Sequence, residues 1–249
     1  MKNKRGLTIG AAIVLGAALV CAAYALSKLR VRYGREQTAE TIKVKGYAEM
    51  PTVADKGKFD ATLVFEGRTM DGTAHPAQQL FQDILNAIRD GAPEDLKLDI
   101  SAPSIEKVYR KDAKGHVTNE VEKYRMSQSV TVYSGDVQWI KKANVSLGAF
   151  ISRGYDIRIG KPSYIVGNLS DLKLKLLKKA TANGFERAKI LAGGSGATVG
   201  ELCSARQGVF QITAPNSTST SDWGCYDTST IEKTAKIVVT LEYKVVTPK

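Results

Sequence analysis

Apolar and polar side chains alternate along several stretches of the chain, a pattern typical of half-buried β-strands. The first stretch covers 42–49 and is closed by Pro51, and the second covers 59–66. We expect these two strands to pair as a long antiparallel hairpin. Further alternating stretches lie at 100–109, 124–133, 155–159, 199–212 and 237–245.

A second hairpin is predicted in the middle of the chain. The alternating stretches 100–109 and 124–133 are separated by polar residues around Lys114 and Gly115, which favour a turn. Two strands joined by one turn pair antiparallel. The first half of the chain is therefore expected to run strand, strand, helix, strand, strand.

From Thr73 onward, apolar residues recur every three or four positions instead of every second one, which predicts a helix. Pro76 fits its opening turn, where a missing N–H costs nothing. Gly91 and Pro93 are expected to end it. A shorter helix is predicted over 136–147.

The longest predicted helix begins at Leu169 and has a stripe of apolar and small residues. Small residues in the middle of the stripe would let the helix lie close against a sheet, although Asn183–Gly184 could instead break it. Lys173 and Arg187 lie near the stripe and must extend their charged ends to water. The stripe consists of Leu169, Leu172, Leu176, Ala180, Gly184, Ala188 and Leu191. Together these elements predict an α+β fold, with helices on one face of a mostly antiparallel sheet.

Residues 6–26 form an uninterrupted run without a charged side chain, flanked on both sides by lysines and arginines. As a helix, such a run reaches about 30 Å, the thickness of the hydrocarbon core of a bilayer. We therefore expect an N-terminal transmembrane helix. Residues 1–36 would be a cytoplasmic stub and signal anchor, and 37–249 an exported domain.

Two other interpretations of this run stay open. Ala23 and Ala25 fit a cleavage site, so the run could be a removed signal peptide, although it exceeds the usual apolar length of about 7 to 15 residues. Cys21 could carry a lipid, although bulky Val20 stands before it where a small residue is expected. The length of the run favours the uncleaved anchor.

The formal net charge of +11 is unevenly distributed. Residues 1–36 hold seven bases and one acid, so +6 belongs to the predicted membrane segment and +5 to the remainder. A mild basic excess of this size is not the clustered footprint of a nucleic-acid binder. We expect no nucleic-acid partner.

Three cysteines are present, and two of them, Cys203 and Cys225, lie in the predicted exported domain. In an oxidising compartment a bond between them would stabilise the fold by about 3 kcal/mol in the chain-entropy model. Two unpaired thiols are the alternative. No CxxC spacing or neighbouring histidine suggests a metal site.

Two surfaces could make contacts. The polar stretch from Thr213 to Thr230 is longer than most structureless loops, and Trp223 and Tyr226 within it could form a contact surface or simply hold the loop on the domain. Four lysines near the start of the long helix could meet anionic headgroups or an acidic partner, or form a solvated helix face. They are Lys173, Lys175, Lys178 and Lys179.

No catalytic or cofactor-binding residues are predicted. The glycine cluster 193–196 follows a predicted helix and precedes a strand, the reverse of a phosphate-binding loop. His75 and His116 stand in polar surroundings with no serine or cysteine in a nucleophile motif. These features favour a protein that is not an enzyme.

Three segments resemble the SIMPL-domain proteins, a bacterial envelope family that includes a periplasmic immunogenic protein. They are the opening Ile-Lys-Val-Lys-Gly-Tyr-Ala at 42–48, the helical Phe-Glu-Arg-Ala-Lys-Ile-Leu-Ala-Gly at 185–193, and the closing Ile-Val-Val-Thr-Leu-Glu-Tyr at 237–243. The resemblance covers about 42–246. The apparent anchor, the glycine-rich turn and the two cysteines depart from the family pattern.

This resemblance implies an exported α+β domain that assembles into large ring or cage-like homo-oligomers, with a role around envelope stress and no established catalytic residues. Combined with the N-terminal run, it implies a single-pass protein of a bacterial inner membrane, with its C-terminal domain in the periplasm or outside the cell. An envelope enzyme with an unrecognised site and a monomeric ligand-binding module are the alternatives.

Overall fold

A computed structural model describes residues 21–24, 26, 40–218 and 223–247. Among these residues no helix is long and apolar enough to cross a membrane. The predicted span at 6–26 and the boundary at 36 lie almost entirely outside the described residues, so both stay predictions.

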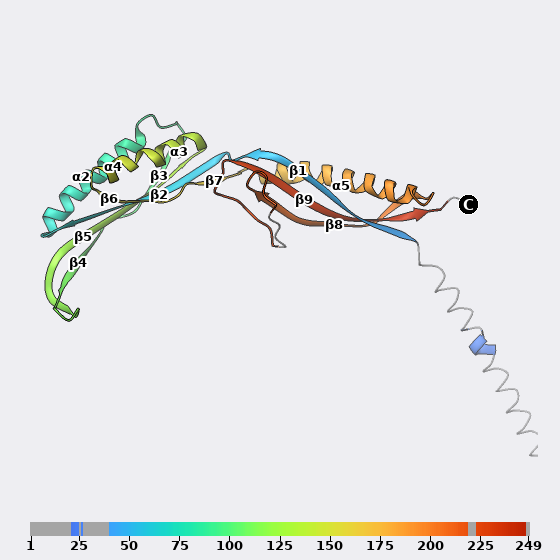
Figure 1. Ribbon diagram of the computed structural model, residues 1–249, viewed down its shortest axis with the longest axis horizontal. Helices are drawn as coiled ribbons and strands as arrows, with labels where there is room; N and C mark the ends of the chain where they lie inside the picture. The colour runs from blue at the N-terminus through green and yellow to red at the C-terminus, as the bar shows by residue number, and fades with distance from the viewer. Residues whose placement is uncertain (1–20, 25, 27–39, 219–222, 248–249) are drawn as a thin grey trace, which may run out of the picture. The chain divides into compact units, whose positions relative to one another are not determined.

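The strands form two sheets (Figure 1). The first has the order β1-β9-β8, formed by β1 (Thr41–Val53), β9 (Glu232–Val246) and β8 (Thr198–Thr213). The second has the order β3-β5-β2-β6, with β4 paired to β5 and β7 paired to β2. Its strands are β2 (Lys56–Gly67), β3 (Lys97–Ile100), β4 (Ser104–Lys111), β5 (Val117–Ser134), β6 (Asp156–Ile159) and β7 (Ser163–Ile165).

The expected hairpin of the first two strands is wrong. β1 pairs with β9, whereas β2 pairs with β5, β6 and β7 in the other sheet. After Pro51 the chain does not reverse in a tight turn: β1 continues to Val53, and Ala54 donates its N–H to Ile231. Alternation identified both strands but did not identify their partners, because the pattern records which face is buried and not which strand lies alongside.

From residue 40 onward, the helices of the described residues are α2 (Met70–Arg89), α3 (Val137–Ser146), α4 (Gly148–Ser152) and α5 (Leu169–Gly193). Thr69 caps α2 by accepting the N–H of Gly72, so the helix begins earlier than predicted and Pro76 lies beyond its first turn. Asp136 caps α3 by accepting the N–H groups of Gln138 and Trp139, as is common for an aspartate at this position. The short α4 was not predicted.

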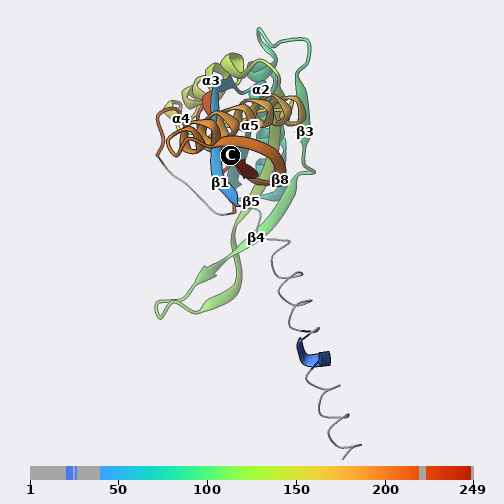
Figure 2. The ribbon, with the colours of Figure 1, turned by 90° about the vertical axis from the view of Figure 1, so that its right-hand side faces the viewer.

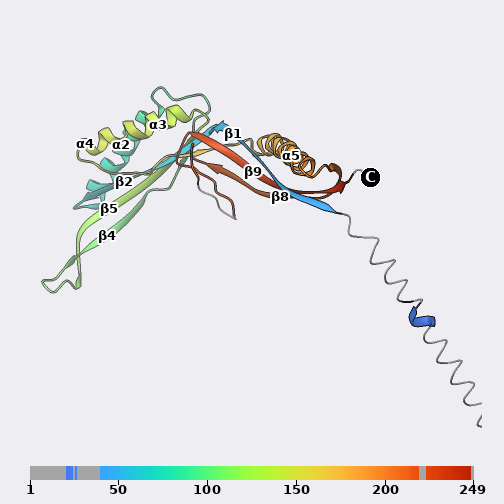
Figure 3. The same cartoon turned by 45° about the vertical axis from the view of Figure 1, so that its right-hand side comes forward.

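Residue contacts divide the chain into two compact units. The first unit comprises the described parts of Met1–Gly46, Ala182–Arg206 and Thr240–Lys249, and the second comprises Tyr47–Thr181 and Gln207–Val239. In the second unit α2 and α3 lie on one face of the six-stranded sheet (Figure 3). The α+β class, with mostly antiparallel strands and helices on one face, is confirmed.

The core of the second unit lies between α2, α3 and this sheet. Strand residues from the inward-facing side of β2 and β5 meet helix residues spaced by three and four, as the sequence pattern predicted. The largest of its fully buried side chains are Phe59, Phe81, Ile84, Ile88, Val130, Ile140 and Leu147. The opposite face of the sheet carries polar and charged residues, including Lys58, Asp60 and Thr62.

In the first unit, the small residues of the long helix allow a close approach to a sheet. A methyl group added at Gly184 would lie 2.7 Å from Leu241 and 3.2 Å from the Cα of Gly46. Phe185 and Tyr243 pack with ring centroids 5.5 Å apart. Asn183–Gly184 therefore does not break α5, and the glycine serves the packing. Leu191, placed on the stripe from the sequence, is instead 59% exposed, and Ala192 is buried.

Candidate functional site

The four lysines near the start of α5 are all exposed. Lys173 places its Nζ 5.2 Å from the ring centre of Phe210, a cation–π contact that lets its stem cover apolar surface. The other three make no ion pair among the described residues. A basic surface is therefore present on this helix, and its binding to lipid or to an acidic partner stays a prediction.

The two loop aromatics have different surroundings. Trp223 is 97% exposed. Tyr226 donates its hydroxyl to the carbonyl of Val166 at 2.8 Å and accepts the N–H of the same residue at 3.2 Å. Burial raises the pKa of this hydroxyl. Tyr226 thus holds the loop on the second unit, which was the plainer of the two interpretations, and Trp223 remains the candidate for an outside contact.

The two domain cysteines carry free thiols in the structure. Cys203 is an exposed residue of β8 in the first unit, and Cys225 is a half-buried residue of the loop in the second unit. Their pairing stays a prediction. Within the described residues, no cluster of three histidine, cysteine or acidic side chains could hold a metal ion.

The glycine cluster after the long helix has the position predicted for it. α5 ends at Gly193, β8 begins at Thr198, and Gly196 has a φ of +74°. The N–H of Ala197 returns to the carbonyl of Ala192 at 3.1 Å, closing the helix. This is a helix-ending turn, as glycine at positive φ commonly makes.

A buried ion pair in the second unit was not anticipated. Lys233 has a side chain that is 0% exposed, and its Nζ lies 2.9 Å from Oδ2 of Asp227 and 2.6 Å from the carbonyl oxygen of Asp227. Burial opposes ionisation of this carboxylate, but hydrogen bonds from Thr230, Ser229 and Lys233 outweigh it and hold the pKa of Asp227 well below its ordinary value. The sequence contained a signal for this pair. In β9, Lys233 alternates with Ala235 and Ile237, so its side chain lies on the same buried face as theirs.

The hairpin of β4 and β5 extends beyond the helices of the second unit as an arm, defined here as residues 104–126 (Figure 2). Pairing of Ile105 with Met126 and of Tyr109 with Val121 places these four on one face. Met126 also pairs with Phe65, which packs against the core, so this face continues the core-facing side of the sheet. Ile105, Tyr109 and Val121 are 37%, 40% and 38% exposed. Lys107, paired with Tyr124, lies between Ile105 and Tyr109 on the same face. We call this the apolar face of the arm.

The opposite face of the arm carries charged residues linked in ion pairs. Arg125 contacts Glu66 at 2.8 Å and Glu106 at 3.0 Å, and Arg110 contacts Glu120 at 2.9 Å. Hydrogen bonds from Lys123 and Arg125 lower the pKa of Glu66. Ion-paired charges therefore cover one side of the arm, whereas the other carries mainly apolar residues and Lys107.

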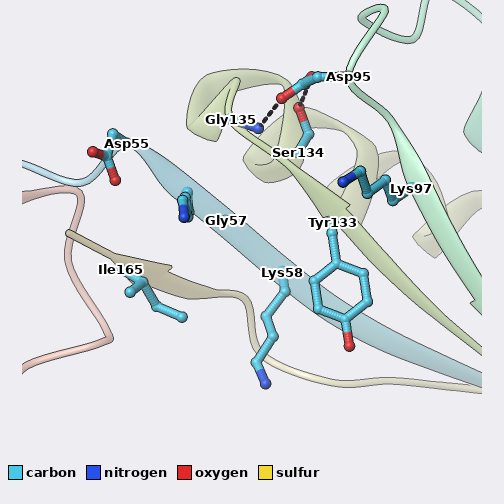
Figure 4. A pocket seen from close by; sticks show the side chains of 10 residues that line it. Asp55, Gly57, Lys58, Asp95, Lys97, Tyr133, Ser134, Gly135 and Ile165 are labelled. Carbon is cyan, nitrogen blue, oxygen red and sulfur yellow. Dashed lines mark hydrogen bonds between the residues drawn. The ribbon is translucent and has the colours of Figure 1, made fainter. Parts of the chain in front are cut away.

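A pocket of about 480 Å³ lies at one end of the six-stranded sheet, on the face away from α2 and α3 (Figure 4). The register places Lys58, Tyr133 and Lys97 in one row across β2, β5 and β3. Figure 4 shows Lys58 and Tyr133 extending side by side from neighbouring strands. Lys56 and Ile165, paired at the next position of the face, complete this wall.

The acidic residues of the pocket are already engaged by hydrogen bonds. Asp95 accepts the N–H of Gly135 and, at 2.8 Å, the hydroxyl of Ser134; these bonds lower its pKa. Asp55 accepts the N–H of Gly167 at 2.6 Å. A Cβ at Gly135 would lie 2.8 Å from Oδ2 of Asp95, so glycine allows this carboxylate to approach the backbone closely.

The lysines of the pocket have no such partners. Among the described residues, Lys56, Lys58 and Lys97 make no ion pair. Three lysines thus line one pocket; in Figure 4 Lys58 extends beside Tyr133, and the ammonium group of Lys97 lies nearer to Ser134. Sequence reasoning missed this site, because its residues come from strands whose partners only the register reveals.

Residues 42–239 match the profile of a family described as SIMPL, a protein of unknown function (DUF541). No curated protein matches the chain. The matched range includes α2 to α5, the arm and every strand of the second sheet, and it ends within β9 of the first sheet. It also agrees with the segments that resembled this family at either end of the domain. The chain belongs to the SIMPL-domain family.

Proposed function

We propose that this protein is a membrane-anchored, non-enzymatic component of a bacterial envelope that self-assembles through its SIMPL domain into a large homo-oligomer, with a role in envelope stress. The observation that carries the proposal is the apolar face of the arm. A two-stranded hairpin is marginally stable alone in water. Ile105, Tyr109 and Val121 lie beyond the helices that cover the rest of the same face.

A second copy of the chain is the occupant that we propose for this face. Burying a large apolar side chain contributes about 1.5–3 kcal/mol relative to leaving it exposed. The charged face of the arm would stay in water, so an arm could dock through one side and remain soluble on the other. Repetition of one contact between identical chains builds a symmetric oligomer.

The sheet of three strands offers further support. β1 and β8 stand at its two ends, and an edge strand presents unpaired N–H and C=O groups to a partner strand. The outer edge of β8 is occupied at Ile212, where the chain from Cys225 to Asp227 bonds to it. In the described residues nothing pairs with that edge over Thr198–Arg206.

The test is the mass of the full-length protein in mild detergent, measured by light scattering. We expect a large oligomer for the natural sequence and a single chain of 26.9 kDa for Tyr109→Asp/Val121→Asp. Two carboxylates buried at a contact would lose their hydration, which is strongly unfavourable. Circular dichroism should be unchanged, since both side chains are partly exposed in one copy.

The matched control is Arg110→Ser/Glu120→Ser on the opposite face of the arm. It removes an exposed ion pair, worth about 0–1 kcal/mol, and should leave the mass unchanged. A natural protein that is strictly monomeric would overturn the self-assembly. An oligomer that survives Tyr109→Asp/Val121→Asp would overturn the part given to the arm.

A further inference from the structure

We propose that the pocket between β2, β3, β5 and β7 binds a small organic phosphomonoester, with its phosphate held by Lys58, Lys97 and Lys56. This goes beyond self-assembly and does not depend on it. Register pairing places Lys58 and Lys97 on either side of Tyr133 in one row of the sheet. Lys56 adds a third ammonium at the neighbouring position of β2.

The charges of the pocket favour an anion. Its two carboxylates, Asp55 and Asp95, are held by the backbone N–H groups of Gly167 and Gly135. Neither makes a direct ion pair with a lysine among the described residues, although the charge of Lys97 also lowers the pKa of Asp95. The three lysines of the pocket exceed its two carboxylates by one positive charge. An anion beside Lys58 and Tyr133, which extend together in Figure 4, would draw the flexible side chains of Lys56 and Lys97 toward it and would displace no ion pair of the described residues.

The kind of donor favours phosphate over carboxylate. Arginine binds a planar carboxylate through two parallel hydrogen bonds, and no arginine lines this pocket. Lysine acts as a compact point charge, and several lysines can approach a tetrahedral group from different sides. A dianion also gains more from three cations than a monoanion does.

The walls indicate an apolar body attached to the phosphate. The ring of Tyr133, the side chain of Ile165 and the stems of the lysines line the pocket. Its volume of about 480 Å³ falls in the range of small-molecule sites. A bare phosphate would leave most of this space empty, whereas an aromatic ester could lie against the tyrosine ring.

Titration calorimetry on the full-length protein in neutral detergent tests the proposal, with phenyl phosphate, inorganic phosphate and benzoate as probes. We expect saturable binding of phenyl phosphate, at least fivefold tighter than that of inorganic phosphate or benzoate. Lys58→Gln/Lys97→Gln should weaken it at least tenfold. Tyr133→Leu should reduce the preference for phenyl phosphate over inorganic phosphate.

The matched control is Lys178→Gln/Lys179→Gln, which removes two exposed lysines of α5 and should leave the affinity unchanged. If dihexanoyl phosphatidic acid, but not dihexanoyl phosphatidylcholine, displaces phenyl phosphate, the natural ligand is a lipid headgroup. If neither lipid displaces it, the natural ligand is a free phosphate ester. The proposal is overturned by absence of saturable binding, by equal affinity for benzoate, or by equal loss in the control.

Discussion

Asp227→Asn is expected to lower the free energy of unfolding by about 3 kcal/mol, because it leaves a buried cation without its counter-charge. Lys233 is fully enclosed, and its ammonium group contacts only Asp227 among the described hydrogen bonds. Chemical denaturation followed by circular dichroism measures the change. The double variant Asp227→Asn/Lys233→Met should recover most of the lost stability, because it removes the unpaired buried charge and replaces the lysine with an apolar side chain of similar volume.

The matched control is Asp112→Asn in the turn of the arm. Asp112 also accepts backbone N–H groups, from Lys114 and His116, but it is exposed to solvent. We expect a change below about 1 kcal/mol there. Equal losses at Asp112 and Asp227 would show that turn hydrogen bonds, and not the buried cation, account for the effect.

The same carboxylate gives the stability a dependence on pH. Because the folded pKa of Asp227 is depressed, its contribution is fully present above the unfolded pKa of about 3.9 and is lost as the pH falls toward the folded value. Asparagine does not titrate. The difference in stability between the natural protein and Asp227→Asn should therefore narrow as the pH falls below about 4, and a constant difference would contradict this explanation.

Gly184→Val is expected to lower the free energy of unfolding by about 2 kcal/mol, because overpacking a close contact forces side chains or backbone to move. The added Cβ alone would lie 2.7 Å from Cδ1 of Leu241 and 3.3 Å from the backbone nitrogen of Gly46. The methyl end of Leu241 can rotate away, but the backbone of Gly46 cannot. Thermal and chemical denaturation of the variant measure the loss.

Gly193→Val provides the matched control, on the same helix. A Cβ at Gly193 would meet nothing within 4 Å, so we expect a change within about 0.5 kcal/mol. Valine has a better helix propensity than glycine, so at Gly184 this effect raises the stability while the clash lowers it. An unchanged or raised stability at Gly184 would mean that α5 can move away from the sheet without cost.

Local patterns predicted the elements of this fold better than its pairings. The stripe through Leu176, Ala180 and Gly184 correctly indicated a helix packed closely on a sheet, and the turn at Gly115 correctly indicated the hairpin of β4 and β5. Both are properties of neighbouring residues. The partner of β1, in contrast, is β9, nearly two hundred residues later in the chain, and alternation carries no information about such a partner.

The candidate site shows the same division. Lys58, Tyr133 and Lys97 come from three strands, and each looks like an ordinary exposed residue of its own segment. Their proximity follows from the register of two strand pairs. The pair of Asp227 and Lys233 could in principle have been predicted from the sequence. A lysine that alternates with buried residues of a strand is itself buried and requires a counter-charge nearby.

The length of β5 has a mechanical consequence. This strand of 18 residues pairs with β2 from Gly57 to Gly67 and with β4 from Ser104 to Lys111, so it passes from the core into the arm as one strand; the register shifts only farther out, between Val108 and Lys111. The tilt of the arm is thereby set by the twist of the sheet, and not by a flexible joint. Neighbouring copies joined through such arms would all meet at one fixed angle, and repetition of a fixed rotation either closes into a ring of defined size or grows into a filament.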